Sequence, residues 1–188
     1  MDMKRVYLAF CVAMVLTLVP IATSCDSSME GYRTLTFNQV AHFSFEYPAH
    51  YEKYSAHATT EDKAIYIGFR DKIVPEGRIN GFIYIYVEGA GITYPDATAA
   101  LEYEISQFVE PENLLECSNV TVTGISAELL VYSHEQEGTI GDINRVTRGV
   151  YFDYNDLIWS IVIESDEDRA DVAQADFEHL LETFQILD

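Results

Sequence analysis

The segment that most constrains the fold runs from residue 146 to residue 187 and has the pattern of strand, tight turn, strand and helix. Asn155-Asp156 separates two apolar runs, and this pair favours a hairpin turn because Asn and Asp tolerate positive φ. The second run, 157–164, is apolar on both faces for most of its length. Such a run is typical of an interior strand that is covered on both sides, so the segment predicts a hairpin at the centre of a sheet.

The residues after this hairpin predict a closing helix that packs on the sheet. Apolar side chains recur there at helical spacing and form one stripe: Ala173, Phe177, Leu180, Leu181 and Phe184. Ser165 followed by Asp168 predicts a capping box, and the acidic run 165–171 complements the positive end of the helix dipole. Calcium also suits such carboxylates, but the spacing does not match an EF-hand loop, so we favour helix capping.

The rest of the chain adds strands and one more helix. Further strands are predicted at 43–48, 64–70, 81–87, 120–122 and 125–134, a helix from Tyr94-Pro95-Asp96 to before Pro111, and a short turn or helical piece at 49–55. The sum is an α+β fold, in which an antiparallel sheet of about six strands is covered by helices.

The N-terminal segment, residues 1–24, predicts a secretory signal, because Lys4 and Arg5 precede an uncharged run. The end of this run, Ile21-Ala22-Thr23-Ser24-Cys25, resembles the lipobox of bacterial lipoproteins, in which the Cys receives a diacylglycerol and becomes the new N-terminus. The resemblance implies a lipid on Cys25. Ordinary cleavage nearby and an uncleaved anchor are the alternatives, and each predicts an extracytoplasmic location, periplasmic or on the cell surface.

Length and composition predict one domain behind a short tether. Residues 25–34 hold the anchor Cys and a polar stretch without periodicity, and residues 35–188 form the predicted domain. Of the 188 residues, 48% are hydrophobic, which is enough for a packed core. Cys117 is the only Cys of this domain, so no disulfide is expected within it and the core must supply the stability.

The formal net charge of −20 limits the partners of the chain. Phosphate backbones and anionic lipid headgroups are repelled by such a surface, so we expect no nucleic-acid binding. Cationic partners or divalent metals are compatible with the charge, and solubility alone also accounts for it.

The order of elements resembles the PsbP-like family, with an opening strand FSFEYPAHYE at 43–52, a mid-chain helix, an antiparallel run and a closing FEHLLETFQIL at 177–187. This family includes the extrinsic PsbP protein of photosystem II, bacterial lipoproteins and a yeast Ran-binding protein. The resemblance implies an antiparallel sheet between helices, and proteins that mostly bind other proteins, some with metal ions. It carries no catalytic signature and transfers no site.

The sequence holds no motif of a hydrolase, metalloprotease, redox dithiol or nucleotide-binding loop, so we expect no enzyme and no cofactor. His50 and His57, with a carboxylate such as Glu52 or Glu61, are the candidates for a metal site; surface histidines in turns are the alternative. A hydrolase built on paired carboxylates would need two carboxyl groups facing each other across a pocket.

Two pairs of residues are candidates for partner binding. Tyr84 and Tyr86 share one strand face with Phe82, which predicts either an aromatic platform for a partner or sugar, or core packing under a helix. Arg145 and Arg148 form a basic pair in an acidic chain, and either cross-strand ion pairing or contact with an anion explains them.

The hypothesis that these patterns favour is a lipid-anchored, extracytoplasmic, non-catalytic domain that binds, or helps to assemble, a protein partner at the membrane. The alternative is a lipoprotein that binds a small molecule or a metal, which requires a cleft with convergent polar groups.

Overall fold

The computed structural model describes residues 31–59, 63–72, 81–138 and 141–187. Within these ranges ten strands form two antiparallel sheets, joined by two α-helices and two short 3-10 helices. In chain order the elements are β1 (Tyr32–Asn38), β2 (His42–Pro48), β3 (Tyr51–Thr59), β4 (Ala64–Asp71), β5 (Phe82–Gly89), α2 (Ala97–Phe108), η1 (Pro111–Asn113), β6 (Leu114–Val122), β7 (Ile125–Gly138), β8 (Gly141–Tyr154), β9 (Leu157–Asp166), η2 (Glu167–Arg169), α3 (Ala170–Thr183) and β10 (Gln185–Ile186).

The large sheet has seven strands in the order β3-β4-β5-β9-β8-β7-β6, and β9 lies at its centre between β5 and β8. The hairpin that joins β8 to β9 turns at Asn155 and Asp156, which have φ values of 52° and 59°. Both predictions for this hairpin are therefore confirmed: the turn uses the left-handed conformation that Asn and Asp tolerate, and the second strand is interior.

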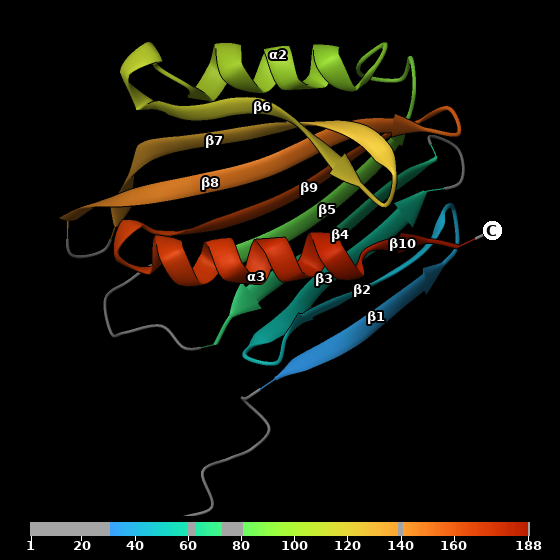
Figure 1. The fold of residues 1–188 in the computed structure, drawn as a ribbon, viewed down its shortest axis with the longest axis horizontal. Helices are drawn as coiled ribbons and strands as arrows, with labels where there is room; N and C mark the ends of the chain where they lie inside the picture. The colour runs from blue at the N-terminus through green and yellow to red at the C-terminus, as the bar shows by residue number, and fades with distance from the viewer. Residues whose placement is uncertain (1–30, 60–62, 73–80, 139–140, 188) are drawn as a thin grey trace, which may run out of the picture.

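One face of the large sheet, which we call the core face, carries the main hydrophobic core. Helix α3 and the three-stranded sheet β1-β2-β10 lie in front of this face (Figure 1). The aromatic side chains at the centre of the core are all 0–1% exposed: Phe43, Phe45, Phe69, Phe152, Trp159 and Phe184. The predicted stripe of α3 points into this core through Ala173, Phe177 and Leu180.

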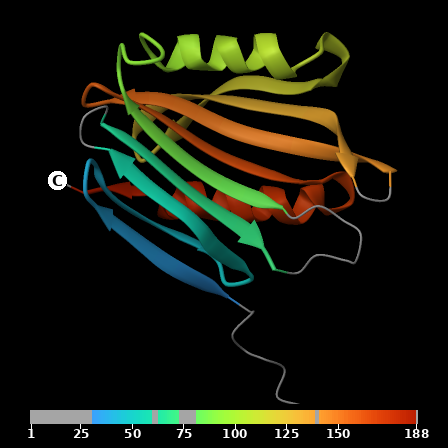
Figure 2. The same ribbon diagram turned by 180° about the vertical axis from the view of Figure 1, so that it is seen from behind.

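The opposite face, which we call the outer face, is covered over part of its width. Helix α2 packs on β7, β8 and β9 through a second, smaller core. Its buried members are Ala97, Leu101, Leu130, Tyr132, Tyr151 and Ile158. Seen from behind, β4 and β5 have no helix in front of them (Figure 2). The predicted sandwich is thus correct in part: each face carries one helix, both helices pack on β8 and β9, and the three-stranded sheet supplies further cover on the core face.

Helix α2 begins at Ala97, directly after the predicted start Tyr94-Pro95-Asp96. Asp96 is its N-cap and accepts a hydrogen bond from the backbone N–H of Ala99 at 2.8 Å. Asp153 of β8 accepts a second helix-terminal N–H, that of Ala97, at 3.0 Å. These carboxylates satisfy backbone donors that the first helical turn leaves without an intrahelical acceptor.

Three expectations about the elements are wrong. Residues 49–55, expected as a turn or helical piece, belong largely to strand β3, in which a register shift between Lys53 and Ser55 disturbs the alternation of side chains. Ser165 and Asp168 form no capping box, because Ser165 lies in β9 and α3 begins only after Arg169. The described residues form ten strands rather than about six, partly because the terminal strands make a sheet of their own.

The predicted signal, residues 1–24, and the anchor Cys25 lie outside the described residues. Strand β1 begins at Tyr32, inside the segment 25–34 predicted as a tether, because Tyr32 and Arg33 pair with Pro48 and Tyr47 of β2. None of the helices in the described part of the chain has the length and apolarity needed to cross a membrane.

Candidate functional site

A cluster of aromatic side chains lies on the outer face over β3, β4 and β5, and we call it the tyrosine face. Its members are Tyr54, Tyr66, Phe82, Tyr84 and Tyr86. Tyr54 is 45% exposed and the other four are half-buried. On the same strand as the last three, Ile83, Ile85 and Val87 point to the core face and are 0% exposed. The two faces of β5 therefore differ, and Tyr84 and Tyr86 are not the core residues under a helix that one interpretation expected.

The rings of the tyrosine face support one another across the strands. The hydroxyls of Tyr54 and Tyr66 are 2.8 Å apart, and the ring of Tyr84 lies 5.6 Å from that of Phe82 and 6.0 Å from that of Tyr66. Gly68 leaves the space for Tyr54, because a Cβ there would lie 2.7 Å from its ring. Burial raises the pKa of Tyr66 and of Tyr84, so both stay neutral phenols that donate and accept hydrogen bonds.

Tyr86 ends the cluster beside a buried carboxylate. Its hydroxyl donates to Oε2 of Glu88 at 2.9 Å, and Glu88 is 1% exposed. Burial, together with this hydrogen bond, raises the pKa of Tyr86 to about 12. The tyrosine face is therefore a platform of neutral aromatic rings with polar tips, which is the side-chain chemistry that protein interfaces favour.

Arg145 is a structural residue on the outer face. Its side chain is 0% exposed and its guanidinium pairs with Glu164 at 2.6 Å and with Asp166 at 3.2 Å on the neighbouring strand β9. It also lies over the ring of Phe82, 5.9 Å from the centroid. Cross-strand ion pairing thus accounts for Arg145.

Arg148 points to the core face, three residues along β8, and it lines a groove between α3 and the β6–β7 hairpin. We call this the α3–β7 groove; it has a volume of about 490 Å³. Its apolar lining includes Leu115, Val120, Leu129, Val131, Phe177 and Leu181, and its charged lining comprises Glu116, Arg148 and Glu178. Nη1 of Arg148 is buried and has no hydrogen-bond partner among the described residues. Desolvation lowers the pKa of Arg148, and three carboxylates nearby counteract this shift.

His50 lies in a charged cluster at the rim of the core, and His57 does not join it. Nε2 of His50 is 3.7 Å from Asp176 and 4.0 Å from Asp71, and Asp71 also pairs with Arg169. His57 is exposed and lies along the extended strand β3, roughly 20 Å of chain away. The described residues contain no group of three or more His, Cys, Asp or Glu side chains that could hold a metal ion. The predicted histidine pair is therefore not brought together.

Burial disfavours the charged forms of two side chains in this cluster, Asp176 and His50. Burial raises the pKa of Asp176 to about 6, although Arg169 counteracts the shift. Burial also lowers the pKa of His50, despite the nearby carboxylate of Asp71. Near neutral pH, Asp176 therefore carries a carboxylate whose Oδ2 is buried and lacks a hydrogen-bond partner among the described residues.

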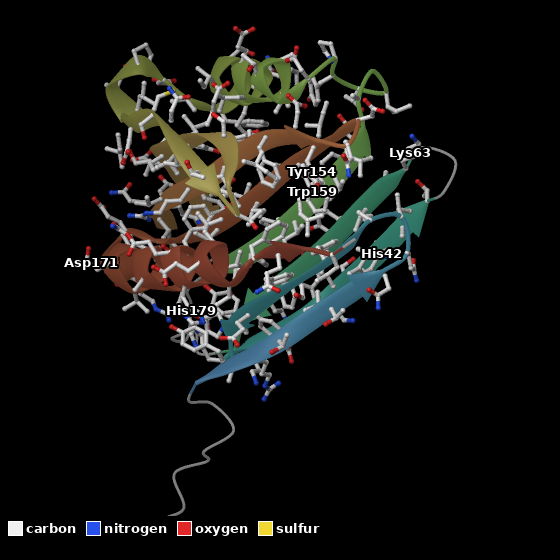
Figure 3. All side chains as sticks on the ribbon, turned by 45° about the vertical axis from the view of Figure 1, so that its right-hand side comes forward. His42, Lys63, Tyr154, Trp159, Asp171 and His179 are labelled. Carbon is white, nitrogen blue, oxygen red and sulfur yellow. The ribbon has the colours of Figure 1, made fainter. Side chains whose placement is uncertain are left out.

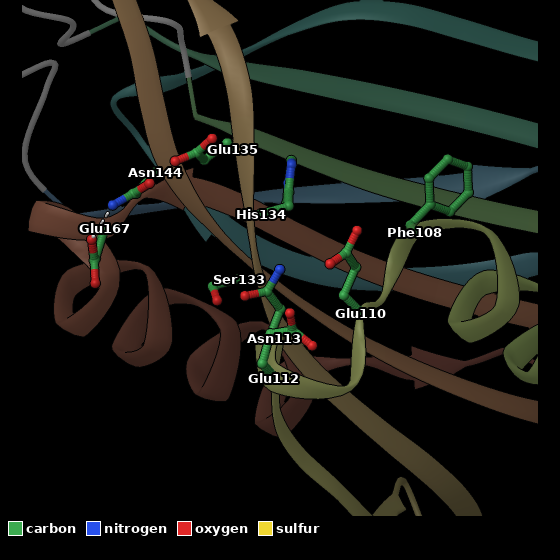
Figure 4. A pocket seen from close by; sticks show the side chains of 9 residues that line it. All are labelled: Phe108, Glu110, Glu112, Asn113, Ser133, His134, Glu135, Asn144 and Glu167. Carbon is green, nitrogen blue, oxygen red and sulfur yellow. Dashed lines mark hydrogen bonds between the residues drawn. The ribbon is translucent and has the colours of Figure 1, made fainter.

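An acidic recess of about 530 Å³ lies where the segment after α2 crosses the sheet (Figure 4). Its lining includes Glu110, Glu112, Glu135, Glu167 and His134, and Asn144 donates to Glu167 at 3.1 Å. In Figure 4, His134 of β7 lies between Glu110 and Glu135. The recess adds to the local negative potential, but its carboxylates do not converge on a metal-binding arrangement.

A second cavity, of about 510 Å³, lies at the edge where β10 meets the β8–β9 turn. Figure 3 shows Tyr154 and Trp159 beside each other, with Lys63 and His42 toward the same edge of the molecule. Trp159 is 0% exposed, and its indole Nε1 is buried without a hydrogen-bond partner among the described residues. An unpaired buried donor costs about 1–3 kcal/mol, so an acceptor that reached this indole N–H would gain from it.

The structure therefore separates the residues that the sequence singled out. Tyr84, Tyr86 and Arg145 lie on the outer face, whereas Arg148 lies on the core face. Pattern reasoning missed the α3–β7 groove, because its walls come from segments that are far apart in the sequence. It also missed the contact between Asp71 and Arg169, which are 98 residues apart.

Several solved structures have a similar architecture. The chain is similar to LpqN of Mycobacterium tuberculosis, described as involved in cell envelope biogenesis, with a TM-score of 0.54 and 12% identity over 85% of this chain and 93% of that one. Cyanobacterial PsbP of Synechocystis sp. PCC 6803 is similar with a TM-score of 0.52 and 13% identity, over 89% of this chain and 99% of that one. The Ran-binding protein Mog1p of Saccharomyces cerevisiae is similar with a TM-score of 0.50 and 10% identity, over 85% of this chain and 97% of that one.

Comparison of amino-acid sequences does not detect these similarities. No protein-family model matches the chain, and no curated protein matches it in sequence. At 10–13% identity the solved structures establish the fold and leave the function open. The resemblance that the order of elements suggested is nevertheless confirmed at that level: the chain has the PsbP-like fold.

Proposed function

We propose that the protein is a lipid-anchored, extracytoplasmic and non-catalytic domain that binds a protein partner at the membrane. Cys25 carries the anchor in this proposal, and residues 26–31 join it to the start of β1. Two similarities of fold support the proposal: LpqN is involved in cell envelope biogenesis, and Mog1p is a Ran-binding protein. Both statements concern those proteins, and they motivate the same class of function here.

The observation that carries the proposal is the tyrosine face. Five aromatic side chains lie side by side on strands that no described helix covers. Rings that are half-buried before binding lose little conformational freedom on binding, and their hydroxyls are placed to form hydrogen bonds. Of the buried charged side chains on this face, Arg145 pairs with Glu164 and Asp166, and Glu88 accepts a hydrogen bond from Tyr86. Recognition of a surface is therefore the role that suits this face.

The proposal is tested by crosslinking in the producing cells, followed by isolation of the tethered protein from membranes and mass spectrometry. A reproducible partner that is lost or weakened in Cys25→Ser supports a membrane-anchored binding protein. The absence of any enriched partner, from cells in which the protein is present at normal abundance, would refute it.

A matched pair of tyrosine variants connects the partner to the tyrosine face. Tyr54 and Tyr103 are 45% and 47% exposed, but Tyr103 lies on α2. We expect Tyr54→Ala to reduce the recovery of the partner by about tenfold and Tyr103→Ala to leave it unchanged, because aromatic anchors dominate interface energetics. Equal recovery with both variants would exclude the tyrosine face as the binding surface.

A second candidate function is binding of a small molecule in the cavity beside Trp159. The unpaired indole N–H of that residue is the observation that favours it. Trp159 is the only Trp of the chain, so its fluorescence reports directly on the cavity. A ligand from a metabolite library that shifts this fluorescence and raises the melting temperature of the full-length protein in lipid nanodiscs supports this function. A library without such a ligand would leave partner binding as the better account.

A further inference from the structure

The core face of the large sheet is covered unevenly. Helix α3 packs on β2, β9 and β8, while the small sheet covers the strands on the far side. The strip of β6 and β7 beside α3 has no helix in front of it in Figure 1, and the α3–β7 groove lies there, next to the part of β8 that carries Arg148 and Val150. Three neighbouring strands span about 10 Å, which is the width of one α-helix with its side chains. One further helix beside α3 would therefore complete this layer of the fold.

The lining of the groove is largely apolar, and Leu115, Leu129 and Leu181 are among the members that are exposed or half-buried. Val131 of β7, Val150 of β8 and Phe177 of α3 are buried, whereas Leu129 of β7 and Leu181 of α3 are half-buried. Leu115 at the rim is 58% exposed, although it is a large aliphatic side chain. Covering the exposed parts of Leu115, Leu129 and Leu181 would remove apolar surface from water and would therefore stabilise a complex.

The charges at the groove select the kind of occupant. Arg148, Val131 and Glu116 lie opposite one another on adjacent strands, and Glu178 of α3 lies on the other wall. Carboxylates therefore flank the single arginine. An anionic amphiphile would gain one favourable charge but meet these carboxylates and a chain of net charge −20. A peptide segment with its own Lys or Arg side chains would pair with these carboxylates. A neutral oxygen on the same segment would accept a hydrogen bond from Nη1 of Arg148.

We propose that the α3–β7 groove binds an amphipathic α-helix of a partner protein, whose apolar stripe is flanked by Lys or Arg side chains. The apolar stripe covers Leu115, Leu129 and Leu181. The basic side chains pair with Glu116 and Glu178, and an oxygen of the partner accepts a hydrogen bond from Nη1 of Arg148. This surface lies on the opposite side of the sheet from the tyrosine face, so the inference does not depend on that face.

Site-specific photocrosslinking in the producing cells tests the inference. A photoreactive amino acid replaces one exposed side chain at a time in the full-length protein: Leu115 at the groove, Ile92 before α2, or Tyr54 on the tyrosine face. Leu115 and Ile92 are 58% and 56% exposed, so they form a matched pair of aliphatic positions. We expect a protein adduct from position 115 and none from position 92, and mapping of the crosslinked peptide should reveal an apolar helical stripe with adjacent Lys or Arg.

Each other outcome contradicts the inference in a recognisable way. A protein adduct at position 54 alone would overturn the groove as a binding surface while leaving partner binding intact. A lipid adduct at position 115 would assign the groove to an acyl chain, and a self-adduct would assign it to a second copy of the chain. No protein adduct at any position would overturn both this inference and the proposed partner binding.

A charge reversal gives a quantitative check with the mapped segment. The synthetic peptide of that segment should bind wild-type protein, and Glu178→Lys should weaken its binding by about tenfold, because a like charge would then face its basic side chains. Glu102→Lys is the control: Glu102 is exposed on α2, beyond the opposite face of the sheet, and its reversal makes the same change of net charge. Equal weakening by both variants would show that only overall charge attracts the peptide and would overturn the groove as its site.

Discussion

The two faces of the large sheet differ in how they achieve burial. On the core face, Phe43, Trp159 and Phe184 pack ring against ring without a charged neighbour inside the cluster. On the outer face, the buried Arg145 pairs with Glu164 and Asp166, Glu88 accepts a hydrogen bond from Tyr86 through Oε2, and tyrosine rings lie between Arg145 and Glu88. Apolar packing is non-directional and tolerates adjustment, whereas a paired charge depends on one geometry. We therefore expect the core face to govern stability, and the outer face to govern the shape of the surface it presents.

The largest expected effect is a cavity on the core face. Phe43 is 0% exposed and contacts the rings of Phe37, Phe45, Trp159 and Phe184. Phe43→Ala should reduce the free energy of unfolding by about 4 kcal/mol, because apolar burial is lost and the void collapses only partly. Tyr84→Ala on the outer face should cost about 1 kcal/mol. Chemical denaturation measures both, and equal costs would remove the proposed contrast between the faces.

The next effect concerns the buried ion pairs of the outer face. Arg145→Met should cost about 3 kcal/mol, because Glu164 and Asp166 would be left without the buried guanidinium. Arg70→Met removes an exposed pair with Glu52 and should cost less than about 1 kcal/mol. Denaturation of the two variants under the same conditions compares them. If Arg145→Met proves as mild as Arg70→Met, the outer face does not depend on its charge network.

An intermediate effect is expected at the rim of the core, with the opposite sign. The pKa of Asp176 is raised from 3.8 to about 6, so the folded state binds its proton more tightly than the unfolded state. This contribution to stability is complete below about pH 4 and is lost as pH rises through about 6. Asp176→Asn should therefore stabilise the protein by about 2–3 kcal/mol at about pH 8 and hardly at all at about pH 4.

The control for this prediction is Asp171→Asn in the first turn of the same helix. Asp171 is exposed and complements the helix dipole, so its removal should cost a few tenths of a kcal/mol. Unfolding measured across this pH range checks both variants. A stabilisation by Asp176→Asn that does not change with pH would show that the carboxylate is not strained by burial.

The smallest effect tests the packing of the tyrosine face. Gly68→Ala places a Cβ against the ring of Tyr54, but that ring is the mobile end of an exposed side chain and can move aside. We expect a cost below about 1 kcal/mol, which should vanish in the Tyr54→Ala background. Thermal unfolding of the single and double variants measures the coupling. A cost that persists without Tyr54 would place the constraint in the backbone of β4.

The parts of the fold that sequence reasoning predicts are those with local causes. The Asn155-Asp156 turn and the Asp96 cap each depend on a few neighbouring residues. Strand β3 is not predicted, because a strand is recognised by side chains that alternate between two faces. The register shift between Lys53 and Ser55 disturbs this alternation. The acidic run at 165–171 suggests a helix cap, but Asp166 pairs with Arg145 across the sheet, a contact with no local signal.

The candidate site is less predictable than the fold. The alternation of side chains identifies Tyr84 and Tyr86, but which face of β5 is covered depends on where α2 and α3 pack. Arg145 and Arg148 look equivalent in sequence, yet an odd separation along a strand places them on opposite faces. Their different roles follow from the neighbours that each face supplies.

The small sheet also determines how the domain responds to a mechanical load. Strand β1 is an edge strand that pairs only with β2, and the pair Tyr32–Pro48 is the one nearest the start of the chain's described part. A pull on Tyr32 directed away from Pro48, across the strands, would therefore open the β1–β2 ladder one pair at a time instead of shearing all pairs together. Strand β2 remains held by β10 and α3. Under such a load, the first residues of the domain would extend before the seven-stranded sheet bears the force.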